Sequence, residues 1–364
     1  MRILVVNAGS SSLKLRLLGD GDDVLGTEDL APVDRLGDGE LGRALDKLGR
    51  FDAVGHRIVH GGERYREPVV VDDDVRAELE ALAALAPLHQ PKSLAALDAV
   101  TGLAPGVPAV ACFDTAFHAT LPPAAATYAV PAEWRDGLHV RRYGFHGLSH
   151  AYAARRADAV IGHPGRLVTC HLGAGASLAA VHDGRCVDTT MGFTPLEGLV
   201  MATRSGTVDP GAVLWLITHH GLEPQAVADT LEHRSGLLAL AGTADMATVV
   251  DAGRRGEPAA TLALDVYVHR LRAAIAAMVA GLCGFDALVF TGGVGENAPT
   301  VRAAAVAGLG FLGAALDDRR NDEAVGAAAA PDADVTAEGS SVRTLVVAAR
   351  EDLEIARGVR ARLR

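Results

Sequence analysis

The residues best suited to chemistry in this sequence are arginines and histidines that stand among small residues. Arg57 and Arg204 each lie in such a segment, GHRIVHGG and MATRSG. A guanidinium group can hold a carboxylate or a phosphate through two parallel hydrogen bonds. His146 lies on a predicted loop, RRYGFHG, beside two further arginines. A lone arginine is more often part of a surface ion pair, and a lone histidine is more often structural, so the pattern alone leaves both interpretations open.

A carboxylate stands where a predicted buried strand ends. Asp114 follows the apolar run from Val107 to Phe113. In α/β folds, active groups gather at the carboxyl ends of strands, so this position favours a functional role. His89 and His171 are further candidates. The His, Cys and Asp residues show no spacing typical of a metal cage, but a hydrated Mg²⁺ needs only one or two protein oxygens and stays allowed.

Three glycine-rich turns follow predicted buried strands, at residues 7–14 (NAGSSSLK), 171–177 (HLGAGAS) and 291–297 (TGGVGEN). Such turns expose backbone N–H groups to an anion, and Lys14 would add a positive charge to the first. The second is not a Walker loop, because no Gly-Lys-Ser/Thr follows. It is a poor dinucleotide fingerprint, because a strand is expected after it. An ordinary hairpin turn, or a tight strand–helix connection for the third, is the alternative interpretation.

The elements that must position these residues alternate between strands and helices, which predicts α/β layers. Strands are expected at residues 3–6 and 13–18, at 167–172 and 178–182, and at 287–290. Helices are expected at 75–86, 94–100, 259–283 and from 352 to the end, with a further helix-like run from Pro299 and a surface helix and loop over 319–341. The strand–turn–strand unit occurs once early in each half, so a duplicated architecture is predicted.

Composition limits the class of protein. The chain has 364 residues, of which 49% are hydrophobic and 22% charged, so two globular domains are expected. The formal net charge of −11 disfavours nucleic-acid binding. We expect no signal peptide or membrane span, and therefore a cytoplasmic protein. The four cysteines, at 112, 170, 186 and 283, are expected to be reduced and mostly buried.

The motifs together resemble those of the acetate kinase family. In order along residues 3–357, the segments that carry the resemblance are LVVNAGSSSLK, GHRIVHGGE, LAPLH, FDTAFHATLP, RRYGFHGLSH, TCHLGAGAS, TPLEGLVMATRSGTVDP, FTGGVGEN and REDLEIAR. The resemblance implies the duplicated actin-like (ribonuclease H-like) fold of the sugar kinase, Hsp70 and actin superfamily. It places one domain at 1–118, completed by the helix 352–364, and a nucleotide-binding domain at 119–351. It also implies a homodimer, ATP, and Mg²⁺ or Mn²⁺.

The resemblance also assigns roles to individual residues. Arg57 and Arg204 would hold the carboxylate and the transferring phosphoryl group, His146 would donate to that group near the transition state, and Asp114 would orient the site. Asn7 and Glu351 would lie near the metal. The apolar pocket for the methyl group of the substrate would consist of Val59, Leu88, Phe145 and Pro195. His89 and His171 would line the phosphate path, and the nucleotide would meet Lys14, His171, Gly173, Gly175, Asp245, Gly292, Gly293, Gly295 and Asn297.

The sequence departs from the family pattern at four places. The family usually has Asn where Ala174 stands, Arg where Ala247 stands, and Gly where Ala202 stands. The stretch Asn-Pro-Pro-Asn is replaced by QPKS at residues 90–93, and the chain is shorter before Arg57. The carboxylate side of the site is therefore intact by pattern, and the nucleotide side is altered.

Acetate is the leading substrate, and ATP is the leading phosphoryl donor. The alternatives are propionate or another short-chain acid, and a different donor such as another nucleotide or pyrophosphate. FTGGVGEN argues against pyrophosphate, because that donor needs no platform for a nucleoside. A non-catalytic actin-like nucleotide sensor is a further alternative, although a sensor does not need Arg57, Arg204 and His146 together.

Overall fold

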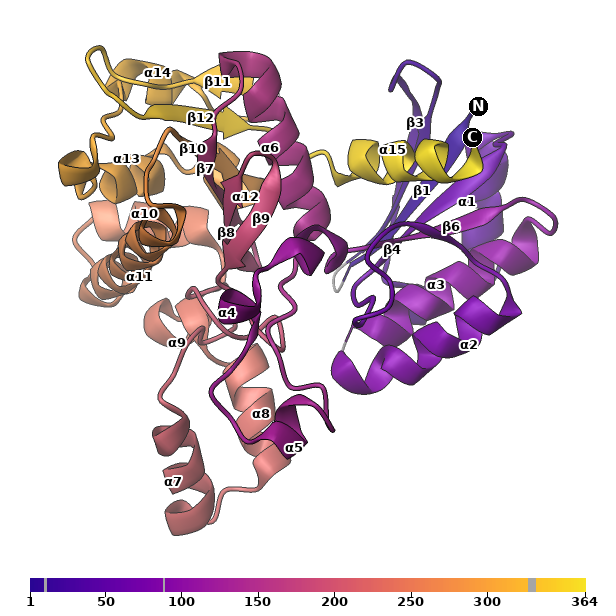
Figure 1. Cartoon of the computed structure of the whole chain (residues 1–364), viewed down its shortest axis with the longest axis horizontal. Helices are drawn as coiled ribbons and strands as arrows, with labels where there is room; N and C mark the ends of the chain where they lie inside the picture. Colours follow the sequence, from indigo (N-terminus) through magenta and orange to yellow (C-terminus); the bar gives the residue numbers. More distant parts are fainter. Residues whose placement is uncertain (10–11, 88, 327–331) are drawn as a thin grey trace. The chain divides into compact units, whose positions relative to one another are not determined.

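The computed structural model describes residues 1–9, 12–87, 89–326 and 332–364, and the chain divides into two compact units. The first unit contains 1–119, 145–152 and 350–364; the second contains 120–144 and 153–349. Figure 1 shows one β-sheet in each unit. The domain boundaries expected from the sequence stay a prediction. Among the described residues, no helix combines the length and apolar composition needed to cross a bilayer.

The first unit is built on a mixed sheet whose strand order is β3-β2-β1-β4-β6-β5. Its central strands β1, β4 and β6 run parallel, while β2 and β3 continue the sheet antiparallel from β1. The strands are β1 (Ile3–Ala8), β2 (Leu13–Leu18), β3 (Val24–Leu30), β4 (Ala53–Ile58), β5 (Val69–Val70) and β6 (Ala109–Phe113). Because the parallel strands are largely buried, β1 and β6 are mainly apolar rather than alternating, whereas β4 (AVGHRI) also carries His56 and Arg57.

Helices cover both faces of this sheet (Figure 1). They are α1 (Glu40–Leu48), α2 (Asp73–Ala81), α3 (Gln90–Leu103) and α15 (Glu351–Leu363), with 3₁₀ helices η1 (Val33–Arg35), η2 (Leu82–Leu85) and η3 (Ala116–Thr120). Leu4 and Val6 pack with α1 and α3 in one cluster, and Ile3 and Val5 pack with α15 in another. A Cβ on Gly55 would lie 2.6 Å from Ile355, so only glycine lets α15 approach β4 this closely.

The second unit repeats the first topology. Its strand order is β11-β12-β10-β7-β8-β9, with β7, β10 and β12 parallel and β8 and β9 antiparallel. The strands are β7 (Arg166–Leu172), β8 (Ala176–His182), β9 (Arg185–Thr189), β10 (Ala287–Thr291), β11 (Asp332–Asp334) and β12 (Arg343–Val347). Each sheet even ends on a short antiparallel edge strand, β5 or β11. The duplicated α/β architecture predicted from the sequence is therefore confirmed.

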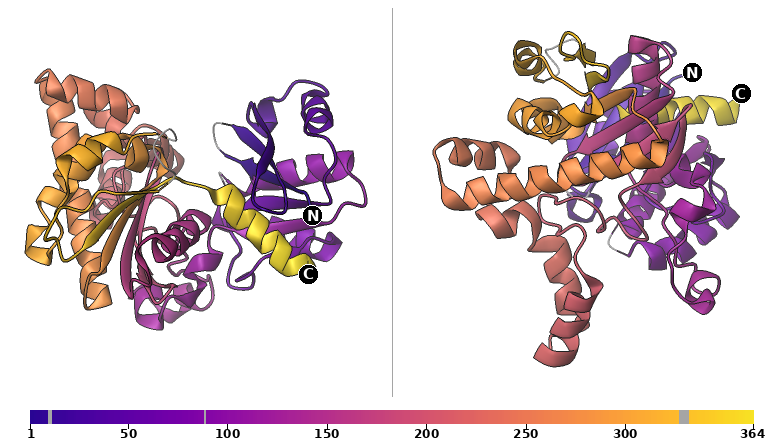
Figure 2. Two further views of the ribbon diagram at one scale, coloured as in Figure 1. Left: turned by 90° about the horizontal axis from the view of Figure 1, so that it is seen from above. Right: turned by 60° about the vertical axis from the view of Figure 1, so that its left-hand side comes forward.

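The helices of the second unit are more varied in length than those of the first. They are α4 (Pro123–Ala126), α5 (Ala132–Arg135), α7 (Pro210–His220), α8 (Pro224–His233), α9 (Gly236–Ala241), α10 (Met246–Arg254), α11 (Pro258–Leu282), α12 (Gly292–Asn297), α13 (Pro299–Ala307), η4 (Gly310–Leu312) and α14 (Asp318–Glu323). The helix α6 (Gly147–Ile161) begins in the first unit and continues into the second. Figure 2 shows the long α11, and α7 and α8 extending away from the sheet of their unit.

The sequence placed several boundaries wrongly. The segment Thr291–Asn297, expected as a turn, forms the short helix α12 from Gly292. Glycine is a poor helix former, but here packing overrides propensity. Gly292 has φ of 81° and its Cβ would lie 2.8 Å from the carbonyl oxygen of Leu172, so this position requires glycine. The predicted helix 94–100 begins at Gln90, and the predicted helix 75–86 ends at Ala81 before a 3₁₀ turn.

Candidate active site

Three polar side chains gather at the carboxyl edge of the first sheet. Asn7 and Arg57 are the penultimate residues of β1 and β4, and Asp114 directly follows β6. Side chains alternate along a strand, so Asn7 lies on the same face as Ile3 and Val5, which is the face that α15 covers. Parallel strands end at one edge of the sheet, and this edge is where the sequence predicted the site.

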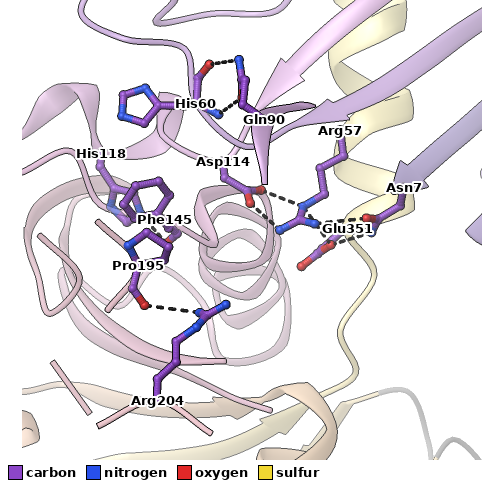
Figure 3. A network of polar contacts seen from close by, with 10 residues as sticks. All are labelled: Asn7, Arg57, His60, Gln90, Asp114, His118, Phe145, Pro195, Arg204 and Glu351. Atoms are coloured by element: carbon purple, nitrogen blue, oxygen red, sulfur yellow. Dashed lines mark hydrogen bonds and ion pairs between the residues drawn. The ribbon is translucent and has the colours of Figure 1, made fainter. Parts of the chain in front are cut away.

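Arg57 is the centre of a network of polar contacts at this edge (Figure 3). Its Nε and Nη2 donate to the two carboxylate oxygens of Asp114 at 3.1 and 2.5 Å. Its Nη1 donates to Oδ1 of Asn7 at 3.2 Å, and Oε2 of Glu351 lies 3.9 Å from Nε. Asn7 in turn donates from Nδ2 to Glu351 at 2.9 Å. The sequence therefore names four residues that the structure brings into one network.

Burial sets the electrostatics of this network. Asp114 is only 1% exposed, and burial raises the pKa of its carboxyl group to about 6; Arg57 opposes the shift and the nearby charge of Glu351 adds to it. Burial alone would lower the pKa of Arg57, but Asp114 and Glu351 together raise it. At neutral pH the pair is therefore ionised. Removing one partner would leave the other as an uncompensated buried charge, which typically costs about 3–5 kcal/mol.

The donor set fits a hard cation that keeps part of its water. Asn7 and Glu351, the two residues assigned to a metal, present amide and carboxylate oxygens beside Asp114. Mg²⁺ prefers such oxygens and commonly uses one or two protein carboxylates together with substrate phosphates. Among the described residues there is no cluster of three or more His, Cys, Asp or Glu side chains that could hold a metal ion alone.

His146 has a strained backbone conformation. Its φ of 57° lies in the left-handed region, which residues other than glycine seldom adopt. The next residue, Gly147, donates its N–H to the carbonyl oxygen of Asp114 at 2.8 Å, and a Cβ there would lie 2.1 Å from that oxygen. The loop of His146 is thus tied to the strand end that carries Asp114. Strain of this kind concentrates at functional sites, and it supports a role for His146.

Part of the predicted methyl pocket lies in the first unit. Phe145 and Val59 are buried, and the carbonyl oxygen of Phe145 is within 2.9 Å of Nε2 of His118. The ring of His60 packs edge-on against Phe145, with centroids 5.7 Å apart. Burial lowers the pKa of His60 and of His118 to about 4, so both rings are neutral at pH 7 and suit an apolar surrounding. Of the two remaining predicted pocket residues, Pro195 lies in the second unit and Leu88 lies outside the described residues.

Gln90 is a buried residue whose contacts the sequence did not reveal. Its side chain is fully buried; Oε1 accepts from the N–H of His60 at 3.0 Å and Nε2 donates to the carbonyl oxygen of His60 at 3.1 Å (Figure 3). Nε2 also lies 3.2 Å from the carbonyl oxygen of Leu79. The departure from the family pattern at this position therefore has a structural consequence, since Gln90 fixes the segment that follows Val59.

Arg204 and Pro195 lie in the second unit. Nη1 of Arg204 donates to the carbonyl oxygen of Pro195 at 3.3 Å, and Nε lies 3.0 Å from Oε2 of Glu232. Glu232 stands near the end of α8 and was not predicted. An ion pair between residues on different elements leaves no local signal in the sequence.

Two of the three glycine turns meet in the second unit. His171 pairs with Thr291 across the parallel strands β7 and β10, so the segments that follow these strands start side by side. A Cβ on Gly173 would lie 3.9 Å from the backbone nitrogen of Gly293 and 3.7 Å from Nε2 of His171. A Cβ on Gly293 itself would meet nothing within 4 Å. This surface of bare backbone can be approached closely by a phosphate or a nucleoside.

The other residues predicted to bind the nucleotide have local partners as well. Asp245 caps α10 by accepting from the backbone N–H and the hydroxyl of Thr248, which lower the pKa of its carboxyl group. Asn297 donates to the carbonyl oxygen of Gly293 at 2.8 Å. Gly295 is buried against β10, and Gly175 accepts from the N–H of Gly173 at 2.9 Å.

Two further predicted site residues belong to the first unit. Lys14 is exposed on β2, directly opposite Asn7, and His89 precedes α3. The roles assigned to all these site residues stay predictions.

A buried arginine supports α12, and the sequence did not single it out. Arg302 on α13 is fully buried, and its Nη1 donates to the carbonyl oxygens of Gly295 and Glu296 at 2.8 and 2.9 Å. Its Nε donates to Oδ1 of Asn321, and Nη2 to the carbonyl oxygens of Asn321 and Ala324. Burial lowers the pKa of Arg302 to about 10, so it remains charged at pH 7. Arg302 thus satisfies carbonyls at the end of the helix that holds Gly292 and Gly293.

Comparisons with known proteins agree on one family. Residues 39–357 match the model of the Acetokinase family. The chain is 42% identical to an acetate kinase of Nostoc punctiforme, with 98% of each chain covered. Its structure is similar to the crystal structure of Porphyromonas gingivalis acetate kinase, with a TM-score of 0.90, 34% identity and complete coverage of both chains. A propionate kinase from Francisella tularensis is similar too, with a TM-score of 0.90, 32% identity and 98% of each chain covered.

Proposed function

The chain belongs to the acetokinase family, and from this membership and the geometry of its polar edge we propose that it transfers the γ-phosphoryl group between ATP and acetate. The observation that carries the proposal is the network of Arg57, Asp114, Asn7 and Glu351 at the carboxyl edge of the first sheet. A sensor that only binds a nucleotide has no need for a mostly buried arginine held by Asp114 and Asn7 at this place.

The reaction needs positioning and positive charge more than a covalent participant. Acetate is ionised at neutral pH, so its oxygen can attack the γ-phosphorus without a general base. Arg57 and Arg204 hold the carboxylate and the transferring phosphoryl group, and Asp114 keeps the guanidinium of Arg57 in place. His146 donates to the phosphoryl oxygens as their charge develops.

The nucleotide occupies the bare backbone around Gly173 and Gly293 in this proposal. The N–H groups there, and His171 beside them, hold the phosphates of ATP or ADP. Asn7 and Glu351 would hold Mg²⁺ or Mn²⁺, which neutralises charge on the phosphate oxygens when it is bound. The oxygen-only donor set of these two residues supports this assignment.

Propionate is the second candidate substrate. The similar structure of a propionate kinase favours it, since that enzyme matches this chain with the same TM-score as an acetate kinase. One additional methylene group in a hydrophobic pocket is worth roughly 1–3 kcal/mol, so the pocket around Val59 and Phe145 would decide between the two acids.

A homodimer is part of the proposal. The helix α7 contains no charged Asp, Glu, Lys or Arg and buries no residue, and it exposes 61% of Leu214 and 51% of Trp215. Figure 2 shows this helix extending away from the sheet of its unit. An exposed apolar surface of this kind is typical of a protein interface, and a second copy of the chain would bury it. Leu214→Glu should then shift the protein toward monomer in sedimentation, and an unchanged sedimentation coefficient would contradict this use of α7.

A cytoplasmic location also belongs to the proposal. All four cysteines are free thiols, and Cys112, Cys170 and Cys186 are buried. Free thiols are typical of proteins from reducing compartments.

An acyl phosphate trap tests the function directly. Purified protein with ATP, a divalent cation and hydroxylamine should form acyl hydroxamate from acetate, and less from propionate and butyrate. GTP and pyrophosphate in place of ATP identify the donor. If the protein binds nucleotide but forms no hydroxamate when a carboxylic acid is added, the result would favour the sensor and contradict the kinase.

A further inference from the structure

Arg204 has a carboxylate partner, Glu232, that comes from a different element. Nε of Arg204 and Oε2 of Glu232 lie 3.0 Å apart, and their side chains are only 18% and 12% exposed. Glu232 is the penultimate residue of α8, whereas Arg204 lies on the segment that precedes α7. A half-desolvated pair of this kind is screened much less by salt than a surface ion pair.

Bonds that do not involve the side chain of Glu232 already hold the two segments together. The hydroxyl of Thr203 donates to the carbonyl oxygen of Glu232 at 2.9 Å, and the N–H of Ser205 donates to that of Leu231 at 3.0 Å. The N–H of Ser235 donates back to the carbonyl oxygen of Thr203 at 2.9 Å. These bonds do not use the carboxylate of Glu232. Its side chain is therefore not needed to dock α8, and its remaining partner is the guanidinium of Arg204.

The guanidinium group of Arg204 contacts Glu232 at one nitrogen and Pro195 and Met201 at another. Glu232 faces Nε, while Nη1 donates to the carbonyl oxygen of Pro195 at 3.3 Å and lies 3.9 Å from Sδ of Met201. A guanidinium is planar, so an attraction at Nε together with a hydrogen bond from Nη1 favours one orientation of the whole group.

Arg57 offers a useful contrast. Asp114 holds it through two hydrogen bonds, and Asn7 and Glu351 add further contacts. For Arg204, the carboxylate of Glu232 lies 3.0 Å from Nε as an ion pair, and no hydrogen bond of good geometry reaches Oε2 in the part of the chain that the structure describes. The carboxylate of Glu232 is therefore a charged neighbour of Arg204 at a mostly buried place, and losing that charge should have a measurable effect.

We propose that Glu232 is a positioning residue that orients the guanidinium of Arg204 toward the reacting anions. The inference rests on the proposed function, because it gives Arg204 a part in the phosphoryl transfer. Glu232 does not touch the substrates in this scheme. It acts through Arg204, by holding a long side chain in the geometry that the transition state requires.

A double-mutant cycle tests the proposal. Glu232→Gln keeps the shape of the side chain and removes its charge, and it is made both in the wild type and in Arg204→Ala. Glu223→Gln is the matched control, because Glu223 is exposed at the start of the same helix. The kcat and the KM values for acetate and ATP are measured by hydroxamate formation, and thermal unfolding is measured for each variant.

We expect Glu232→Gln to lower kcat about tenfold and to change the KM for ATP less than about twofold, with Glu223→Gln unchanged. In Arg204→Ala the same substitution should lower kcat less than about twofold further, because its target is gone. Glu232→Asp keeps the charge but shortens the side chain, so its kcat should fall between those of the wild type and Glu232→Gln. If Glu232→Gln fails to fold, Glu232→Asp takes its place in the comparison.

Three results would overturn the proposal. The first is a wild-type kcat in Glu232→Gln, and the second is the same fold loss with and without Arg204. The third is a loss of kcat matched by a rise in the KM for ATP and a lower unfolding temperature, which indicates a general structural role. A wild type without acetate-dependent hydroxamate would overturn the proposed function itself, whereas an active wild type with any of these three results overturns only the role of Glu232.

Discussion

The two sheets of this protein share one strand order, but the residues at their carboxyl edges differ: charged and polar side chains at the first, and glycines at the second. At the edge of the first sheet the parallel strands end in Asn7, Arg57 and Asp114, which form a charged network with Glu351. At the same edge of the second sheet, β10 ends at Thr291 and is followed by Gly292 and Gly293. The topology sets where a site can lie, and the residues at the strand ends decide what it binds.

The difference matches two kinds of ligand. A small acid offers few atoms, so charged side chains must reach it and fix its orientation. A nucleotide is larger and carries several phosphates, and it gains most from a flat backbone surface with many N–H donors. Duplication supplies two equivalent edges, and in the proposed function the divergence of the residues at the strand ends adapts each edge to one ligand.

The largest effect should come from breaking the charged edge. Arg57→Lys keeps a positive charge but loses the planar fork that holds Asp114. We expect kcat to fall on the order of a hundredfold to a thousandfold, while the KM for ATP changes less than about threefold. Arg76→Lys is the matched control, since Arg76 holds Asp98 through the same two-bond geometry on the surface of the first unit. Equal kcat values in the two variants would remove Arg57 from the reaction.

The charged edge should also respond to pH. Burial raises the pKa of Asp114 to about 6, so its carboxylate is protonated as the pH falls through that value. Protonation weakens its hold on Arg57, and turnover should fall about tenfold per pH unit below 6 while staying level above it. Asp114→Asn should give low turnover without this acid limb. A limb near the ordinary pKa of a free carboxylic acid would instead point to the substrate.

The sequence predicted the residues of the charged edge better than the buried polar residues that hold the site segments in place. Asp114 and the turn after Asn7 are visible because an apolar run ends at a polar residue, which is a local signal. Gln90 and Glu232 are not visible, since each contacts residues about thirty positions away through an amide or a carboxylate. Arg302 resembles a surface arginine on a helix until the fold buries it.

The second edge was misjudged for a related reason. Glycines suggested a turn over residues 292–297, but contacts with β7 fold them into α12. Local propensity favoured the turn, and only the packing between distant segments reveals the helix. The architecture was easier to predict, because two strand–turn–strand units of similar pattern are apparent in the sequence itself.

Substitutions of the neighbouring Gly292 and Gly293 should distinguish an effect on folding from an effect on nucleotide binding at the second edge. A Cβ on Gly293 meets nothing within 4 Å, so Gly293→Ala should leave the unfolding temperature unchanged or slightly higher. The added methyl group would occupy the open backbone surface, and we expect the KM for ATP to rise about tenfold while the KM for acetate stays constant. Gly292→Ala should destabilise the protein, because its φ of 81° disfavours alanine. An unchanged KM for ATP in Gly293→Ala would show that the nucleotide does not bind over Gly293.

The smallest expected effect concerns Ala174, where the family usually has asparagine. Ala174 is exposed in the turn between β7 and β8, and its carbonyl oxygen accepts from the N–H of Ala202 at 3.1 Å. Its backbone has no positive φ, so asparagine can replace it without strain. Ala174→Asn adds an amide donor where the phosphates are proposed to lie, and a hydrogen bond to a charged acceptor is worth roughly 1.5–3 kcal/mol. After the entropy of ordering the side chain is subtracted, the KM for ATP should fall about threefold to tenfold.

Ala174→Asp supplies the control, because it has nearly the same shape but repels phosphate and should raise the KM for ATP. If both substitutions act alike, residue 174 does not face the phosphates. If Ala174→Asn raises the KM for ATP but leaves the KM for another donor unchanged, the glycine edge has diverged toward that donor. The two sheets would then still bind different ligands, with a donor other than ATP at the second.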